Sequence, residues 1–181
     1  MDKGSIDYRR FLDGDESGLE NIITDYKDGL ILYLNTLVGN IALAEDLAED
    51  TFVRLFTRKP RDKGTGSFKT WLYTIGRNMA ISYLRKAGKQ ATIPMDTVEF
   101  LQSGDEPLTA YLKEESRLAV HRAMEKLKPD HRQILWLIYF ENLSCRDAAV
   151  ILKKSVHATE MLASRARQAL KTQLNELEVT L

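Results

Sequence analysis

The chain has 181 residues, of which 44% are hydrophobic and 29% are charged, and its formal net charge is zero. This composition is typical of a globular protein with one ordinary domain or two small ones. It has no apolar run long enough to span a membrane, we expect no signal peptide, and the single cysteine, Cys145, excludes an internal disulfide. These features predict a cytoplasmic protein without direct membrane insertion.

The zero net charge hides blocks of alternating sign. Residues 1–60 carry −5, residues 61–95 carry +6, residues 96–130 carry −3 and residues 131–181 carry +2. Proteins that bind nucleic acid concentrate Lys and Arg in such local patches. Chance segregation of charge on solvated helices would produce the same pattern, so charge alone does not decide between the two.

Apolar spacing and capping residues predict an all-α fold with two small helical domains. Residues 1–17 are polar and are expected to be frayed, apart from a helical turn around residues 6–12. Residues 88–107 contain Gly and Pro without a sustained period and are expected to form a flexible linker between domains 1–87 and 108–181. Helices are predicted, in chain order, at residues 17–38, 41–57, 67–86, 108–127, 129–140, 144–152 and from 156 onward.

The helix over residues 41–57 combines a buried stripe with an acidic face. Its inward positions are Leu47, Ala48, Thr51, Phe52, Leu55 and Phe56. Its exposed side carries four carboxylates, those of Glu45, Asp46, Glu49 and Asp50. Like charges at i,i+4 spacing cost roughly a few tenths of a kcal/mol per pair. Tolerance of that repulsion favours a cationic partner, whereas the simpler interpretation is a solvated helix face.

The helix over residues 67–86, with Ser67 as its N-cap, mixes aromatic and basic residues. Its predicted buried stripe is Phe68, Trp71, Leu72, Ile75, Met79, Tyr83 and Leu84. The residues outside that stripe are Lys69, Tyr73, Arg77, Asn78, Ser82, Arg85 and Lys86. Cations neutralise phosphates, aromatic rings stack on unpaired bases and Asn pairs with base edges, so this face is typical of a surface that holds a separated DNA strand. Burial in the core is the simpler interpretation of any single aromatic residue here, and Tyr73 is the best exception because it lies off the stripe.

The second half of the chain has the spacing of a helix-turn-helix. Pro129 suits the first turn of an apolar helix, and Ser144 with Asp147 forms a capping box for a short helix. A bend at Lys153-Lys154 then precedes a longer helix, which in such motifs enters the major groove. Candidates for base contact are His157, Ala158, Glu160, Met161 and Ser164, and candidates for phosphate contact are Arg165, Arg167 and Lys171.

Three motifs follow one another in this chain, at Ala44–Phe56, at Ser67–Arg85, and at Leu127–Arg132 with Tyr139–Ser144 and Arg165–Arg167. Together they resemble the sigma-70 family of bacterial transcription initiation factors, specifically its small extracytoplasmic-function (ECF) group. The first resembles the polymerase-binding helix of sigma region 2, and the second resembles the segment that melts and reads the minus-ten promoter element. The third resembles region 4, which reads the minus-thirty-five element.

The resemblance implies a transcription initiation factor that directs promoter recognition and DNA melting. The implied partners are core RNA polymerase, through its beta-prime clamp helices and beta flap, promoter DNA, and an anti-sigma factor. The implied polymerase contacts are Asp46, Glu49, Asp50, Phe52 and Arg54. The implied minus-ten contacts are Lys69, Trp71, Tyr73, Arg77, Asn78, Arg85 and Lys86. The implied minus-thirty-five contacts are Lys153, Lys154, Ser155, His157, Glu160, Met161, Ser164, Arg165, Arg167 and Lys171.

This sequence departs from the family pattern at the helix-turn-helix. Lys153 and Lys154 stand where the family commonly has Gly and an apolar residue, and a non-Gly residue in a left-handed turn costs ~1–2 kcal/mol. Glu160 and Leu162 occupy two usually basic positions of the recognition helix. We therefore expect an unusual minus-thirty-five preference, with the two lysines supplying part of the missing positive charge.

Neither a catalytic centre nor a metal or cofactor site is expected. The histidines, His121, His131 and His157, lack metal-ligand spacing, and Ser144 and Cys145 have no His-Asp pair to activate them. The sequence has no phosphate-binding Gly-rich loop. Two alternatives stay open: a stand-alone helix-turn-helix regulator, and a sigma-like module that binds polymerase without reading DNA.

Overall fold

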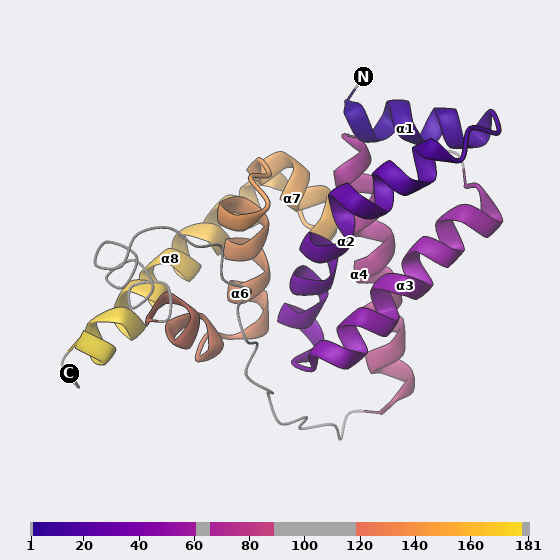
Figure 1. Ribbon diagram of the computed structural model, residues 1–181. Coiled ribbons are helices and arrows are strands. Elements are labelled where there is room, and N and C mark those ends of the chain that lie inside the picture. The colour runs from indigo at the N-terminus through magenta and orange to yellow at the C-terminus, as the bar shows by residue number, and fades with distance from the viewer. Residues whose placement is uncertain (1, 61–65, 89–118, 179–181) are drawn as a thin grey trace, which may run out of the picture.

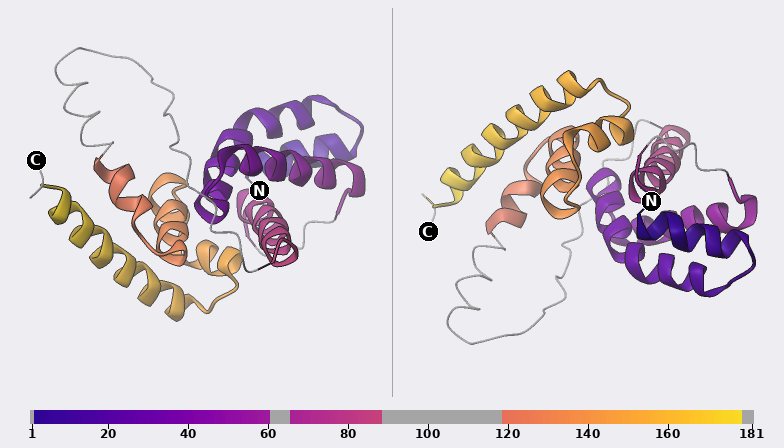
Figure 2. Two further views of the ribbon diagram at one scale, coloured as in Figure 1. Left: turned by 90° about the horizontal axis from the view of Figure 1, so that it is seen from below. Right: turned by 90° about the horizontal axis from the view of Figure 1, so that it is seen from above.

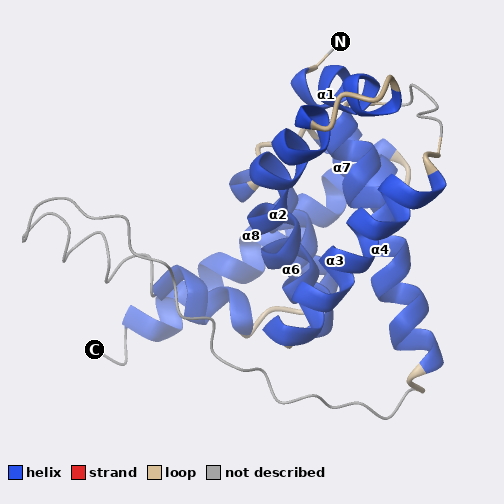
Figure 3. Cartoon of the chain, turned by 45° about the vertical axis from the view of Figure 1, so that its right-hand side comes forward, coloured by secondary structure: helices blue, strands red, loops and turns tan. Residues whose placement is uncertain are grey.

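The computed structural model describes residues 2–60, 66–88 and 119–178, and every regular element in this part of the chain is a helix (Figure 3). The elements are α1 (Lys3–Leu12), α2 (Ser17–Val38), α3 (Ile41–Arg58), α4 (Phe68–Lys86), α6 (Pro129–Leu135), the π-helix η1 (Trp136–Phe140), α7 (Cys145–Leu152) and α8 (Val156–Glu178). A helical segment over residues 119–125 precedes α6. The all-α prediction is confirmed. Most of the predicted linker and residues 108–118 of the next predicted helix lie outside the described residues.

Helices α1 to α4 form the N-terminal domain, in which α2 packs against α1, α3 and α4 (Figure 1). The predicted connection between α2 and α3 is confirmed: Gly39 ends α2 at φ 64°, and the Asn40 side chain accepts a hydrogen bond from the Leu43 N–H at 3.0 Å. These local caps place α2 and α3 as a helical hairpin. The core of the domain is made by Ile22, Leu30, Tyr33, Leu34, Leu47, Leu55, Phe68 and Leu72.

The helical turn predicted around residues 6–12 is confirmed, but the prediction that the rest of residues 1–17 is frayed is wrong, because the helix already begins at Lys3. α1 is a ten-residue helix whose N-cap is Asp2. Its Tyr8 is buried, with the ring 5.7 Å from that of Phe68 and the hydroxyl donating to the Pro60 carbonyl at 2.8 Å. Tyr8 and Pro60 are 52 positions apart, so the contacts that order α1 leave no trace in its own polar composition.

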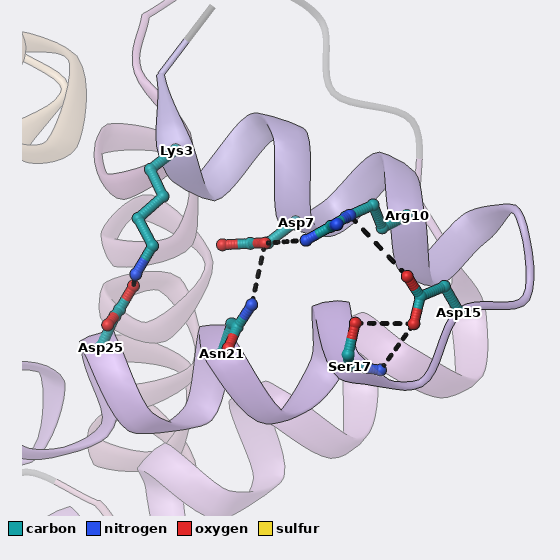
Figure 4. A network of polar contacts seen from close by, with 7 residues as sticks. All are labelled: Lys3, Asp7, Arg10, Asp15, Ser17, Asn21 and Asp25. Carbon is teal, nitrogen blue, oxygen red and sulfur yellow. Dashed lines mark hydrogen bonds and ion pairs between the residues drawn. The ribbon is translucent and has the colours of Figure 1, made fainter.

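Polar contacts join α1 to α2 around the buried carboxylate of Asp7 (Figure 4). Asn21 of α2 donates to this carboxylate at 3.1 Å. Arg10 pairs with it at 3.7 Å and also with Asp15, in the turn between the helices, at 3.7 Å. A buried carboxylate needs such partners, because desolvation without them is costly. Asp7 therefore helps to set where α1 lies on α2.

Helices α6, η1, α7 and α8 form the C-terminal domain, together with residues 119–125. The predicted caps are confirmed: Pro129 stands at the first turn of α6, and the Ser144 side chain accepts from the Asp147 N–H at 3.1 Å. The helix predicted over residues 129–140 differs in its second part, because Trp136 begins a π-helix. The wider turn stacks the rings of Trp136 and Phe140 at 4.3 Å.

The two domains pack against each other, with α4 on α7 and α2 on α6 (Figures 1 and 2). The sequence analysis expected domains joined by a flexible linker and made no prediction of a contact between them. This contact decides which predicted site residues face solvent and which do not.

Candidate functional site

The acidic ridge, which we define as Glu45, Asp46, Glu49 and Asp50, lies on the exposed face of α3. Among the described residues these four carboxylates make no ion pair. Within the described residues, no ion pair therefore offsets their mutual repulsion at i,i+4 spacing. Val53, one turn further along α3, is 58% exposed and adds an apolar side chain next to the charges. The predicted exposure of the ridge is confirmed.

Phe52 lies on the opposite side of α3 from the ridge. It is only 6% exposed, and its ring stacks on that of Phe56 with the centroids 6.1 Å apart. The prediction of Phe52 as a direct polymerase contact is incompatible with this burial, because the side chain points into the core. Phe52 instead packs in the core beneath α3 and so helps to hold the helix that carries the ridge. Arg54 is exposed, as its predicted role requires.

A groove of about 670 Å³ lies between α3 and α4. Its walls include two aromatic rings, Trp71 and Tyr83, and the amide of Asn78. Two cations, Arg54 and Lys86, also line it. This set combines a stacking surface, a base-edge partner and phosphate partners. Of the predicted minus-ten residues, Trp71, Asn78 and Lys86 thus lie together, and Arg85 is exposed next to them in sequence.

Trp71 and Tyr83 form the aromatic part of this α3–α4 groove in different ways. Trp71 is half-buried, with its ring 5.2 Å from that of Tyr8 in α1. Tyr83 is 43% exposed, so its prediction as a buried stripe residue is wrong. The helix α4 runs six residues, nearly two turns, past its last buried residue, Ala80. The apolar period continues there and Leu84 still packs against the core, but within the described residues Ile81 and Tyr83 are exposed. Helical period alone does not indicate which part of a stripe is covered.

Lys69, Tyr73 and Arg77 lie on the other side of α4, against the C-terminal domain. Tyr73 is 0% exposed, so the prediction that it is an open stacking residue is wrong for this arrangement. Its ring stacks on Tyr33 of α2 with the centroids 5.3 Å apart. Arg77 Nε donates to the side-chain oxygen of Gln133 at 3.3 Å.

The side chain that meets Lys69 and Tyr73 is Glu141, directly after the π-helix. The Tyr73 hydroxyl donates to Glu141 Oε2 at 2.7 Å, and Lys69 Nζ lies 2.7 Å from the same oxygen. Burial and the neighbouring Glu141 carboxylate together raise the pKa of the Tyr73 hydroxyl, so it stays protonated and donates. The sequence placed Glu141 between two predicted helices and within the Tyr139–Ser144 motif, with no predicted partner. No local pattern marks a residue whose partners lie 68 and 72 positions away.

The helix-turn-helix presents the start of α8 to solvent. All ten predicted minus-thirty-five residues, from Lys153 to Lys171, are exposed. Apolar spacing in the sequence predicts Val156, Thr159, Ala163, Ala166 and Leu170 on the inner face of this helix. Thr159, Ala163 and Ala166 are buried as expected, whereas Val156 is exposed. Lys153 has φ 54°, the left-handed conformation expected at the bend.

Two further findings concern the described part of the chain. None of its helices is both long enough and apolar enough to cross a membrane. Its His, Cys, Asp and Glu side chains form no group of three or more with the arrangement of a metal site.

Two family models match this chain. Sigma-70 region 2 matches residues 22–90, and sigma-70 region 4 matches residues 117–170. The sigma-H factor of Pseudomonas aeruginosa is 26% identical over 173 residues, which are 91% of this chain and 90% of that protein. The ECF sigma factor SigW of Bacillus subtilis is also 26% identical over 173 residues, covering 91% of this chain and 92% of the relative.

Among solved structures, the sigma factor RpoE from Bartonella quintana, in complex with the anti-sigma factor NepR, is similar with a TM-score of 0.70. The two chains are 25% identical, and the match covers 86% of this chain and 96% of the other. The two sigma-70 regions together cover about two-thirds of the sequence, in the order region 2 then region 4. The chain therefore belongs to the sigma-70 family of RNA polymerase sigma factors, in its extracytoplasmic-function group, and is a transcription initiation factor.

Proposed function

We propose that this sigma factor binds core RNA polymerase through the acidic ridge, holds the melted minus-ten strand in the α3–α4 groove, and reads the minus-thirty-five duplex with α8. One observation carries the proposal: Asp50 and Arg54 lie on the exposed side of α3 and also line the groove. A polymerase surface bound to the ridge would therefore border the bound strand. Polymerase binding and base trapping are then coupled, because the ridge and the groove lie next to each other.

The proposed polymerase contact is electrostatic with an apolar centre. Four unpaired carboxylates suit a basic surface, such as the beta-prime clamp helices, and Val53 adds area that water leaves on binding. The aromatic side chains Tyr139 and Phe140, both exposed on the C-terminal domain, support the beta flap as a second polymerase contact.

The proposed strand contact uses stacking to offset unpairing. Extruding a base from a duplex costs about a few kcal/mol, and stacking on an aromatic side chain returns ~1–3 kcal/mol per base. Trp71 and Tyr83 supply rings in the groove, Asn78 supplies a partner for a base edge, and Lys86 supplies a charge for phosphate.

The proposed minus-thirty-five contact is made by α8 in the major groove. Lys153, Lys154 and Arg165 are exposed and can meet phosphates. Glu160 is also exposed and can accept a hydrogen bond from the amino group of cytosine, although it repels phosphate. The preference at this element is then expected to depend on the base opposite Glu160.

An anti-sigma factor is the proposed regulatory partner, and the bacterial cytoplasm is the proposed place of action. The support is that RpoE of Bartonella quintana, which this chain resembles, was solved in complex with an anti-sigma factor. Core polymerase and promoter DNA are the other proposed partners, and both are met in that compartment.

The ridge is tested by measuring the affinity of the full chain for core polymerase. Asp46→Lys should weaken binding at least tenfold, about 1.4 kcal/mol, because it places a cation against the proposed basic surface. Glu20→Lys, an equal change of charge on an exposed residue of α2, is the matched control and should leave the affinity unchanged. Equal affinities of the two variants would refute the ridge as the docking surface.

The groove is tested with reconstituted polymerase on a promoter duplex. Tyr83→Ala should retain closed-complex binding and reduce open-complex formation roughly 5- to 100-fold, the equivalent of one lost stack. Ile81→Ala, also exposed on α4 but outside the groove, should change neither step. Equal loss of both steps, or of neither, in Tyr83→Ala would exclude a stacking role. Wild-type chain that binds promoter duplex without polymerase would instead favour a stand-alone regulator.

A further inference from the structure

Glu141 is a buried carboxylate whose neighbours are all hydrogen-bond donors. It is 9% exposed, and its Oε2 accepts from the Tyr73 hydroxyl and pairs with Lys69 Nζ, both at 2.7 Å. Its Oε1 accepts from Trp136 Nε1 at 3.2 Å, and Lys69 also donates to its backbone carbonyl at 2.9 Å. Lys69 and Tyr73 belong to the N-terminal domain, so the contacts to Oε2 and to the backbone carbonyl exist only while the two domains are in contact.

Helix α2 leaves room for this cluster at Gly29. The residue stands in the middle of α2, where glycine weakens a helix relative to alanine. A Cβ added there would lie 2.6 Å from the Tyr73 hydroxyl oxygen and 3.1 Å and 3.2 Å from the two carboxylate oxygens of Glu141. Helix α2 therefore has the one residue type without a Cβ at the point where Glu141 enters the N-terminal domain.

The contact extends along α4 on both sides of Glu141. The Thr70 hydroxyl donates to Asp147 at 3.1 Å, and Arg77 Nε donates to Gln133 at 3.3 Å. In each pair α4 supplies the donor and the C-terminal domain supplies an oxygen acceptor. A row of donors that includes two cations is also what binds the phosphate oxygens of a DNA strand.

We propose that Glu141 holds the two domains together by occupying, at Lys69 and Tyr73, the place of a DNA phosphate. The chain in this closed state thereby inhibits its own binding of promoter DNA. We call Lys69, Tyr73, Trp136, Glu141 and Gly29 the Glu141 lock. The acidic ridge and the α3–α4 groove stay open in the closed state, so polymerase can bind before the domains separate. The identity of the excluded ligand rests on the proposed function.

The lock makes DNA binding at the face of α4 that carries Lys69, Tyr73 and Arg77 a competition within the chain. DNA reaches Lys69, Tyr73 and Arg77 only when Glu141 and its domain have moved away. A ligand shifts such an equilibrium only as far as its affinities for the two states differ. Promoter DNA bound to the opened face of α4 stabilises the open state, whereas the free chain returns to the closed one.

The first measurement is the distance between the domains in the full chain without polymerase. Donor and acceptor dyes are placed at Glu20→Cys in α2 and Gln168→Cys in α8, both exposed, in a Cys145→Ala background. Glu141→Gln should shift the chain toward the open state at least fivefold. The Gln amide has the same shape as the Glu carboxylate, but its NH₂ group must face a neighbouring donor, from which it cannot accept a hydrogen bond.

Two further variants separate the lock from general effects. Gly29→Ala should also open the chain at least fivefold, through the clash at the lock, although alanine favours the helix itself. Asp130→Asn removes the same charge as Glu141→Gln from the same domain, at an exposed residue outside the interface, and should leave the distance unchanged. Circular dichroism verifies that each variant keeps its helices.

The second measurement is the affinity of the same chains for a labelled single-stranded minus-ten oligonucleotide. Glu141→Gln and Gly29→Ala should bind it at least fivefold more tightly than wild type, and Asp130→Asn should not. Unchanged inter-domain distances in both lock variants would overturn the proposal. Open domains without tighter binding would overturn the inhibitory role, while transcription by wild-type chain with polymerase would still support the proposed function.

Discussion

Lys153 carries backbone strain at the bend of the helix-turn-helix, and its removal has a calculable effect. The residue has φ 54° and ψ 45°, in the left-handed region. Its N–H donates to the Val150 carbonyl at 3.3 Å, and the Lys154 N–H donates to the Ala149 carbonyl at 3.0 Å. This is the Schellman pattern, in which glycine is the usual residue at the left-handed position.

The expected effect of Lys153→Gly is the difference of two costs. A residue with a side chain loses ~1–2 kcal/mol in the left-handed conformation. Glycine in its place loses roughly 0.5–1 kcal/mol through its greater freedom in the unfolded chain. Lys153→Gly should therefore stabilise the C-terminal domain by about 0.5–1 kcal/mol. For a domain of this size the melting temperature should rise by about 2–8 °C.

Thermal unfolding is followed by the fluorescence of Trp136, which is buried in this domain, in a Trp71→Phe background. Lys154→Gly is the matched control, because it removes the same charge from the next residue, whose φ is not positive. That variant should be no more stable than wild type. A Lys153→Gly chain no more stable than the Lys154→Gly chain would refute the strain at Lys153. Both variants should lose affinity for minus-thirty-five DNA, since each removes a cation.

Gly18→Ala should destabilise the N-terminal domain by about 1–3 kcal/mol, because the added Cβ would clash with the Asp7 carbonyl oxygen of α1. Amide exchange in α1 should then be faster. Unchanged exchange in α1 would contradict this close contact between α1 and α2. Asp2→Ala should cost about 1 kcal/mol at neutral pH, because the Asp2 carboxylate accepts from the N–H groups of Ser5 and Phe68 at 3.0 and 3.1 Å. Burial raises the pKa of Asp2, but these hydrogen bonds outweigh it and hold the pKa below 3.8. The stabilisation by the Asp2 carboxylate is therefore fully present above pH 3.8 and is lost as the pH falls through the pKa of the folded state. Urea unfolding of wild type and Asp2→Ala should thus give a stability gap that narrows below pH 3.8, and a constant gap would exclude the effect.

Local signals determined most helix boundaries. The span predicted for α2, residues 17–38, is the one observed, because Gly39 and Asn40 end one helix and begin the next through contacts within a few residues. The capping box at Ser144 predicted α7 for the same reason. In the candidate site, helical period predicted the exposed ridge on α3 and the exposed start of α8.

Non-local contacts decided what the sequence could not. The order of α1 depends on packing against Phe68 and Pro60, more than fifty positions away. The π-helix at Trp136 accompanies a cluster whose other members come from α4. Helical period placed Phe52 inward, as observed, and only the family resemblance made it a contact residue. Tyr83 was expected to be buried but is 43% exposed, because period gives the direction of a side chain but not what lies there.

The amino-acid sequence by itself therefore determined the family, through its three motifs, and most of the helices with the residues that share each helix face. Those helices and faces follow from local hydrogen bonding and the periodicity of an α-helix. Tertiary structure alone decided which of those faces are open. Tyr73 lies off the apolar stripe of α4, as its position in the sequence requires, yet it is buried, and a carboxylate of the second domain accepts a hydrogen bond from its hydroxyl. Burial of a polar face requires a partner with matching acceptors, and that partner was 68 positions away along the chain.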